Sequence, residues 1–187
     1  MSQPYDEIIA GIILREGTEY SDRPEDRGGP TKFGLTIKTL ARYRGLTATV
    51  QDVQELEVQE ARAIYEKLYI RDPEFDQILG LNQPIGLEVI DTGVNCGVVT
   101  AGIMLQRVLN AFNMKGQHYH NLKLDGVCGM KTRRALMIFL ARRKREGETI
   151  MLRALNALQG ERYISIAERD EEQEANVYGW FRTRVVL

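Results

Sequence analysis

The hydrophobic residues of this chain recur mainly at intervals of three and four positions, which is the spacing of amphipathic helices. The apolar run 8–14 predicts a first helix that ends at Glu16. A short second helix fits residues 38–43, because Gly45 follows it as a stop signal. Residues 53–68 continue the pattern, with Glu and Gln on the opposite face. The first third of the chain is therefore expected to be helical, apart from the segment that follows Glu16.

The second half of the chain shows the same periodicity. Helices are predicted over about residues 85–94, 100–112, 132–145 and 148–169, the last being the final helix. Thr132 suits the N-cap of the third of them. Residues 113–130 hold several glycines and are predicted to form a long loop, in which Leu122, Leu124 and Val127 allow a brief strand pair. The fold class expected from the pattern is mainly α, with room for a short β-hairpin.

The composition is that of a soluble globular protein. The chain has 187 residues, 43% of them hydrophobic, and a formal net charge of −1. So small a net charge gives no bulk attraction to nucleic acid or membranes, and the basic run 142–145 suits a solvated helix end. Cys96 and Cys128 are too few for a disulfide framework, so we expect two small buried side chains, with a single bridge as the alternative.

The start of the chain lacks the features of a targeting segment. Residues 1–7 place acidic rather than basic side chains ahead of the apolar run, which is itself too short to span a bilayer. We therefore expect synthesis in the cytoplasm without a signal peptide, and no stable membrane insertion. No linker rich in Pro, Gly and Ser separates two halves, which predicts one compact unit.

The segment 16–36 carries the candidate chemistry. It reads Glu16-Gly17-Thr18-Glu19-Tyr20, and then Asp26-Arg27-Gly28-Gly29-Pro30-Thr31-Lys32-Phe33-Gly34-Leu35-Thr36. A carboxyl group that closes an apolar helix loses solvation, which favours the protonated form that a general acid needs. The glycines that follow let the backbone approach an extended ligand closely. The pattern indicates acid catalysis by Glu16, against the alternative of a surface residue at a helix end.

These residues resemble the E-G-G-Y box and the D-x-G-G-x-T-x-x-G-I-T motif of glycoside hydrolase family 108, a family of phage endolysins and bacterial N-acetylmuramidases. The first box is one residue longer here, so Glu19 is the alternative in the catalytic position; Glu16 is favoured because Gly17 follows it and it continues the apolar helix. Later segments resemble, in the same order, the family's Tyr-containing helix and the peptidoglycan-binding region behind it. They are residues 61–69, 91–97, 105–106, 125–132 and 179–184.

The resemblance implies a compact lysozyme-like helical fold, in which residues 1–95 form the muramidase catalytic region and residues 96–187 a peptidoglycan-binding region packed on it. The implied activity is hydrolysis of the β-1,4 bond between N-acetylmuramic acid and N-acetylglucosamine, with Glu16 donating a proton to the glycosidic oxygen. Asp26 is the candidate second catalytic carboxylate, with a loop-stabilising turn as the alternative. No cofactor is implied.

Five further residues are candidates for substrate binding. Tyr20 suits stacking on a sugar ring, and Thr31 and Thr36 suit holding a water molecule or the loop. Asp91 and Asn95 lie one helical turn apart and share a face, where they brace the catalytic loop or line the glycan groove.

Peptidoglycan is the expected partner, bound by a monomer that binds no nucleic acid. No metal site is predicted, because His118 and His120 lie in a loop without the spacing of known zinc motifs. A protein made in the cytoplasm would reach the cell wall (periplasm) through holin-type release or another export route. Two other functions stay open: a lytic transglycosylase acting on the same bond, and a non-catalytic peptidoglycan-binding protein whose working part is residues 125–132.

Overall fold

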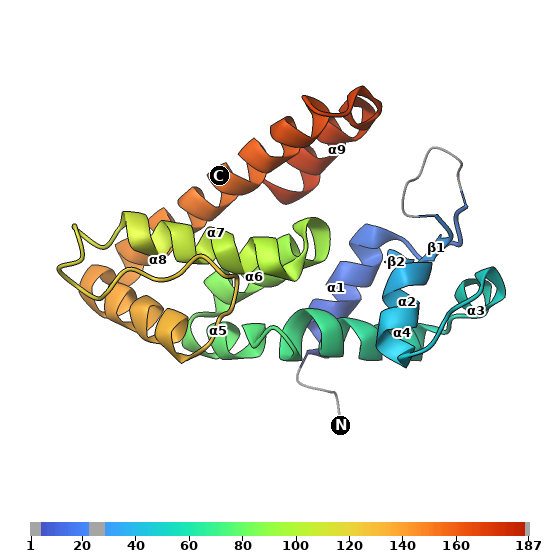
Figure 1. Cartoon of the computed structure of the whole chain (residues 1–187), viewed down its shortest axis with the longest axis horizontal. Coiled ribbons are helices and arrows are strands. Elements are labelled where there is room, and N and C mark those ends of the chain that lie inside the picture. The colour runs from blue at the N-terminus through green and yellow to red at the C-terminus, as the bar shows by residue number, and fades with distance from the viewer. Residues whose placement is uncertain (1–4, 23–28, 186–187) are drawn as a thin grey trace. The chain divides into compact units, whose positions relative to one another are not determined.

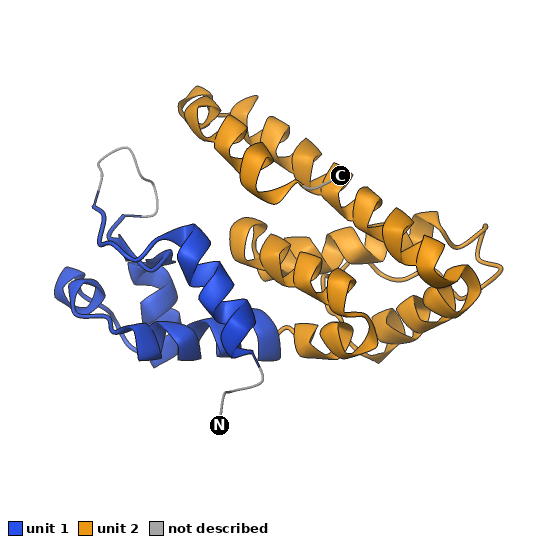
Figure 2. Ribbon diagram, turned by 180° about the vertical axis from the view of Figure 1, so that it is seen from behind, with its two compact units in different colours: residues 1–72 blue, residues 73–187 orange. Residues whose placement is uncertain are grey.

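The computed structural model describes residues 5–22 and 29–185 and divides into two compact units, Met1–Asp72 and Pro73–Leu187 (Figures 1 and 2). Helices dominate both units, and the described residues hold one sheet, made of two antiparallel strands. The expected mainly α fold with a short β-hairpin is confirmed. The division of the chain after residue 95 stays a prediction.

Unit 1 is built from short helices around a core of aliphatic side chains. Its elements are α1 (Asp6–Glu16), β1 (Thr31–Lys32), β2 (Leu35–Thr36), α2 (Ile37–Arg44), α3 (Val50–Gln54), α4 (Val58–Tyr65) and the π-helix η1 (Glu66–Arg71). Ile9 and Ile12 bury the apolar side of α1, each being 2% exposed. As predicted, α2 ends before Gly45, which adopts a left-handed backbone and donates its N–H to the Ala41 carbonyl.

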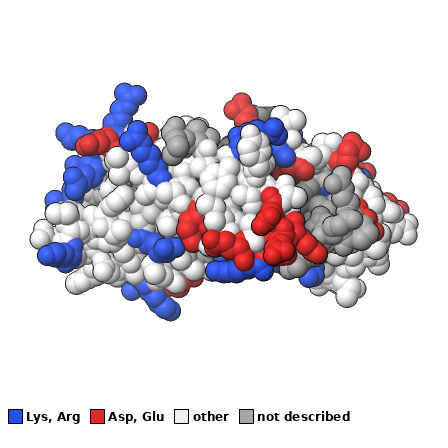
Figure 3. Space-filling model, turned by 90° about the horizontal axis from the view of Figure 1, so that it is seen from above, with Lys and Arg blue, Asp and Glu red and all other residues white. Residues whose placement is uncertain are grey.

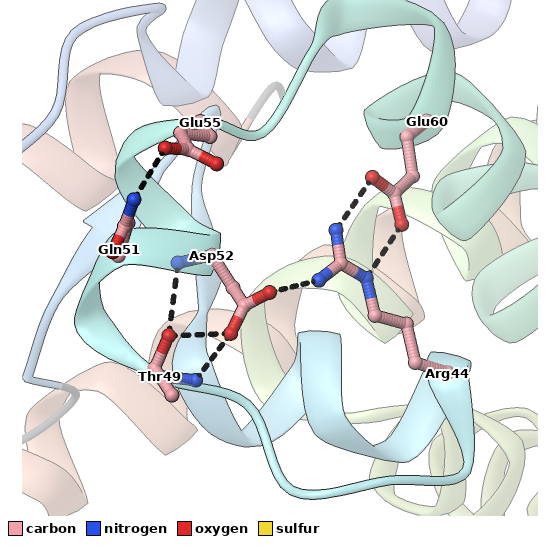
Figure 4. A network of polar contacts seen from close by, with 6 residues as sticks. All are labelled: Arg44, Thr49, Gln51, Asp52, Glu55 and Glu60. Carbon is pink, nitrogen blue, oxygen red and sulfur yellow. Dashed lines mark hydrogen bonds and ion pairs between the residues drawn. The ribbon is translucent and has the colours of Figure 1, made fainter.

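One arginine ties three helices of unit 1 together (Figure 4). Arg44, at the end of α2, donates two hydrogen bonds of 2.9 Å to the carboxylate of Glu60 on α4. Its Nη1 lies 2.5 Å from Oδ1 of Asp52 on α3. Asp52 also accepts a hydrogen bond of 2.7 Å from the backbone N–H of Thr49, so that the two residues form a capping box at the start of α3. The network therefore fixes how α2, α3 and α4 pack.

Unit 2 contains the longest described helices, together with shorter ones. They are α5 (Phe75–Leu81), α6 (Gln83–Cys96), α7 (Val98–Ala111), α8 (Met130–Ala167), the short 3-10 helix η2 (Glu171–Gln173) and α9 (Glu174–Arg184). The helices predicted over 85–94 and 100–112 are confirmed as α6 and α7. The two predicted over 132–145 and 148–169 are joined in α8 across a kink at Lys144, whose φ of 52° is not helical.

Two expectations about α8 are wrong. Thr132 is not its N-cap: Gly129 holds that position, and the Thr132 hydroxyl instead donates to the Val127 carbonyl at 3.0 Å. The helix over 148–169 is also not the last, because α9 follows it. The sequence of α9 lacks the apolar stripe by which an amphipathic helix is recognised. In agreement, no residue of α9 is fully buried.

The loop before α8 is held by amide side chains of α7 rather than by strand pairing. Asn110 exchanges two hydrogen bonds, of 2.8 and 2.7 Å, with the carbonyl and N–H of Leu122. The side chain thus supplies the bonds that a partner strand would give. The strand pair expected around residues 122–127 is therefore wrong, and the hairpin of the described chain lies at residues 31–36 instead.

The amide side chain of Gln106 on α7 holds the segment 125–132 in place. Gln106, which is 1% exposed, donates from Nε2 to Asp125 Oδ1 at 2.9 Å and to the Val127 carbonyl at 3.0 Å. Its Oε1 accepts from the Gly126 N–H at 2.9 Å. Gln106 therefore connects the end of the loop to α7 and fixes the position at which α8 begins.

The C-terminal helix α9 is anchored by aromatic contacts and an ion pair. The ring of Tyr163 on α8 lies 5.1 Å from that of Trp180 and 5.9 Å from that of Phe181, measured between centroids. Arg184 Nη1 lies 2.9 Å from Asp91 Oδ1 on α6, and these side chains are only 7% and 18% exposed. The 179–184 segment thus attaches α9 to both α6 and α8.

Cys96 and Cys128 are both free thiols rather than a bridged pair in the structure. Cys128 is buried and Cys96 is half-buried. Burial raises the pKa of Cys96 to about 11 and the pKa of Cys128 to about 12. Both groups are therefore protonated at neutral pH.

Candidate active site

Glu16 is the last residue of α1, and its half-buried side chain packs against the hairpin. A Cβ atom added at Gly34 would lie 2.6 Å from Glu16 Cβ and 2.8 Å from its Cγ. The chain leaves the helix directly after the carboxylate, because Gly17 has a φ of 89° and donates its N–H to the Ile13 carbonyl at 3.0 Å. The helix end and the hairpin together fix where Glu16 lies.

The hairpin is closed by a two-residue turn whose residues both have positive φ. These are Phe33 (φ 54°) and Gly34 (φ 74°), the conformation that matches the twist of two paired strands. Tyr65, which is 1% exposed at the end of α4, donates its hydroxyl to the Phe33 carbonyl at 2.8 Å. The turn that contacts Glu16 is therefore held from behind by α4.

A second tyrosine, Tyr69, is influenced by the charge of Glu16. Tyr69 lies in the π-helix η1, and its ring centroid is 5.4 Å from that of Tyr65. Burial raises the pKa of Tyr69, the charge of Glu16 adds to this rise, and a hydrogen bond from Thr39 and the charge of Arg42 oppose it. The π-helix, a rare element that often marks functional sites, thus brings Tyr69 into contact with Thr39 of α2 and within the electrostatic influence of Glu16.

The two threonines predicted for the site hold the backbone around it. Thr36 is the N-cap of α2: its Oγ1 accepts from the Thr39 N–H at 3.3 Å and lies 3.1 Å from Thr39 Oγ1. Thr31 donates its hydroxyl to the Gly29 carbonyl at 2.8 Å. Its backbone also exchanges two hydrogen bonds of 2.8 Å with Ser21. Both side chains hydrogen-bond to backbone groups close to the hairpin, and their roles toward a substrate stay predictions.

Asp26, the predicted second carboxylate, lies outside the described residues. Tyr20 is half-buried, and its hydroxyl is 3.4 Å from Asp22 Oδ2. Glu19 is exposed, with the Thr18 hydroxyl 3.4 Å from its Oε1. Of the two glutamates near the end of α1, Glu16 is the one that packs against the hairpin.

Asp91 and Asn95 both lie on α6 in unit 2, whereas the other described candidates belong to unit 1. Asp91 forms the ion pair with Arg184 that anchors α9. Asn95 Oδ1 accepts a long contact of 3.5 Å from Cys96 Sγ. Among the described residues, no group of three or more His, Cys, Asp or Glu side chains is placed to hold a metal ion.

Tyr65, Tyr69 and Thr39 could not be singled out from the sequence as site residues. Tyr65 donates to the Phe33 carbonyl and Thr39 hydrogen-bonds to Tyr69, and both pairs are far apart in the sequence. The available signal was the spacing of the two tyrosines, four residues apart in a segment that already resembled a family motif. That spacing places them on one side of a helix without saying what they touch.

Comparison with known proteins divides the chain in two. The family model of glycosyl hydrolase 108 matches residues 9–97, and that of a predicted peptidoglycan domain matches residues 100–185. The fold is similar to that of Brucella abortus SagA, with a TM-score of 0.67 and 21% sequence identity over 97% of this chain and 98% of that one. A comparison with curated proteins gave no match. Glu16 and the hairpin lie within the first matched region.

Proposed function

Because residues 9–97 of the chain belong to the glycosyl hydrolase 108 family, we propose that its catalytic centre is the neighbourhood of Glu16 in unit 1. Together with the peptidoglycan domain over residues 100–185, this family makes the protein a peptidoglycan hydrolase of the N-acetylmuramidase type. The bond to be cleaved is the β-1,4 bond between N-acetylmuramic acid and N-acetylglucosamine.

Glu16 is the proposed general acid. The reaction needs a carboxylic acid that protonates the glycosidic oxygen as the sugar ring becomes an oxocarbenium-like cation. The observation that supports Glu16 is its fixed position, since the end of α1 and the Phe33–Gly34 turn confine its side chain. A confined acid keeps its orientation towards the leaving oxygen, which lowers the entropic cost of proton transfer.

Asp26 is the proposed second carboxylate, which either activates a water molecule or stabilises the positive charge on the ring. Ser21 and Thr31, which lie on either side of it in the sequence, pair with each other. Tyr20, Thr31 and Thr36 are proposed to contact the glycan from the same unit.

Asp91 and Asn95 remain candidates for glycan binding by unit 2. We further propose that the protein acts on the wall as a monomer without binding nucleic acid, after holin-type release or another export route. In the part of the chain that the structure describes, no helix is long and apolar enough to cross a membrane.

Digestion of purified sacculi tests the assignment. Glu16→Gln keeps the size of the side chain and removes the donated proton, so the release of reducing ends should fall at least about a hundred-fold. Binding to sacculi and the melting temperature should stay unchanged. Glu19→Gln is the matched control and should keep activity. The reverse result, loss in Glu19→Gln alone, would assign the acid to Glu19.

The same digest distinguishes hydrolysis from transglycosylation. Mass spectrometry should find reducing muramic acid ends if water completes the reaction. Anhydromuramic ends would mean that the muramic acid's own hydroxyl attacks, and that the enzyme is a lytic transglycosylase. Asp26→Asn in the same assay should lower the rate without lowering the melting temperature if this carboxylate takes part in catalysis.

A further inference from the structure

The net charge of −1 hides a strong separation of charge along the chain. Residues 98–145 hold ten Lys or Arg and a single acidic residue, Asp125, whereas the remaining positions hold fifteen basic and twenty-five acidic residues. Figure 3 shows blue Lys and Arg side chains gathered toward the left of its view. One part of unit 2 is therefore strongly cationic although the chain as a whole is not.

Apolar side chains share the surface with these cations. Met130 and Met137, in the first half of α8, are 76% and 54% exposed. They recur with Arg134 and Ala141 at intervals of three and four residues, so these four positions lie on one face of the helix. The opposite face, which includes Leu136, is buried in the core.

Lys131 and Arg142 lie along one side of this stripe, and both are exposed, as is Arg134. None of these three cations forms an ion pair with a residue that the structure describes, in contrast to Arg133, whose Nη1 lies 2.7 Å from Glu74 Oε2. We call the set Met130, Lys131, Arg134, Met137 and Arg142 the α8 face. Its charges and its apolar groups are available to a partner.

We propose that the α8 face is a peripheral contact by which unit 2 attaches reversibly to an anionic phospholipid surface. Cations that alternate with exposed apolar side chains fit the boundary between lipid headgroups and acyl chains. A polysaccharide or a nucleic acid would use the cations but would leave Met130 and Met137 in water. The loop before α8 adds to this composition with Met114, 52% exposed beside Lys115, and Leu124, 49% exposed beside Lys123.

The inference goes beyond glycan cleavage. Attachment to the membrane surface would keep the hydrolase at the side of the cell wall that faces the lipid. It would act through charge and shallow insertion, so it requires no spanning helix.

Sedimentation of the full-length protein with vesicles tests the proposal. The protein should bind vesicles of phosphatidylglycerol and phosphatidylethanolamine and should not bind phosphatidylcholine vesicles. Lys131→Gln/Arg134→Gln/Arg142→Gln should lower the partition coefficient about a hundred-fold, about five-fold for each cation removed from the headgroup region. Arg153→Gln/Arg169→Gln/Arg182→Gln makes the same change in net charge at exposed positions outside the face and should bind like wild type.

A second pair of variants tests the apolar part. Met130→Ser/Met137→Ser should weaken the binding that survives at high salt, whereas Ile164→Ser, at a position 48% exposed on the other half of α8, should not. All these substitutions are at exposed positions of unit 2, whereas Glu16 belongs to unit 1, so vesicle binding is measured separately from the assignment of Glu16.

Several results would overturn the proposal. One is that the wild type fails to bind anionic vesicles, or binds neutral vesicles equally well. Another is that the two triple variants lose vesicle binding to the same extent. A third is that the Met130→Ser/Met137→Ser variant binds vesicles as well as wild type at high salt. Loss of binding to sacculi or to duplex DNA in the face variant, with vesicle binding unchanged, would assign the face to that polymer instead.

Discussion

At the scale of single residues, Gly34 is the position at which the hairpin meets Glu16. Gly34→Ala should lower both stability and activity, because the new Cβ would lie 2.6 Å from Glu16 Cβ and 2.9 Å from the Tyr65 hydroxyl oxygen. Gly45→Ala is a matched control, since Gly45 has a similar φ of 69° but open space around it. Each change should cost about 1 kcal/mol through the backbone alone.

The two glycine variants should separate in the activity assay. Sacculus digestion per folded molecule should fall at least about ten-fold for Gly34→Ala, because a displacement near 1 Å at a catalytic group has effects of that size. Gly45→Ala should keep its activity and show only a lower melting temperature. Equal activities for the two variants would show that the turn does not position Glu16.

Glu88 on α6 makes the stability of unit 2 depend on pH. Burial raises the pKa of Glu88 to about 7, the charge of Asp91 adds to the effect, and hydrogen bonds from Asn156 and Thr92 oppose it. An unfolded chain returns this carboxyl group to its ordinary range near 4.3. The folded state therefore binds the proton more tightly, and this stabilisation is complete below about pH 4 and disappears as the pH rises to about 7.

Thermal melts of wild type and Glu88→Gln measure this contribution. The wild type should lose stability relative to Glu88→Gln between about pH 4 and pH 7, because only the wild type must ionise a buried group. The informative quantity is the difference between the two melting curves at each pH, since other groups titrate in both proteins. A difference that does not change with pH would contradict the prediction.

At the scale of elements, the Arg44 network should decide how unit 1 responds to acid. Hydrogen bonds from Thr49, and then Arg44, hold the pKa of Asp52 below its usual range, and Arg44 does the same for Glu60. Lowered pKa values in the folded state mean that the stabilisation is present above about pH 4 and is lost as the pH falls further.

Arg44→Met should therefore melt about 5 °C below wild type at pH 7 and much closer to it at pH 3. Calorimetry at both pH values would measure the two melting temperatures. Lys38→Met removes a cation from α2 outside this network and is the control. A constant gap between wild type and Arg44→Met would show that the guanidinium contributes by packing and not through the two carboxylates.

Elements that bury an apolar stripe could be predicted from the sequence, and elements defined by tertiary contacts could not. The α1, α2, α6 and α7 helices follow from periodicity and stop signals, as does Glu16 as a carboxylate at an apolar helix end. The hydrogen bond from Tyr65 to Phe33 joins residues 32 positions apart, and nothing in the local pattern encodes it. The same holds for α9, which is positioned by the ion pair of Arg184 with Asp91 and by the packing of Trp180 against Tyr163.

At the scale of the whole molecule, the boundary between the two compact units predicts where the chain tolerates a cut. Truncation after Phe112 removes α8 and α9 and uncovers side chains of α6 and α7, among them Leu105 and Leu109, each 0% exposed in the intact chain. That fragment should aggregate or melt without cooperativity. Residues 73–187, which keep all of unit 2, should give a cooperative transition.

Near-ultraviolet circular dichroism and a melt of each fragment make this comparison. The 1–112 fragment should also fail to digest sacculi. A soluble, cooperatively melting and active 1–112 fragment would mean that the removed helices are an accessory and that α6 and α7 do not depend on them.

The raised pKa values of Cys96 and Cys128 affect how easily this chain is oxidised. Cell-wall substrates lie outside the reducing cytoplasm, and a thiol is oxidised or exchanged through its thiolate form. With a pKa of about 11 for Cys96 and about 12 for Cys128, only about one Cys96 sulfur in a thousand is ionised at pH 8, and fewer for Cys128. These raised pKa values predict slow air oxidation of the folded enzyme, which counting its free thiols after exposure to air would measure. Unfolding returns both thiols to a pKa near 8.5. If the chain unfolds in an oxidising environment, a disulfide between Cys96 and Cys128 can therefore form and trap the unfolded state.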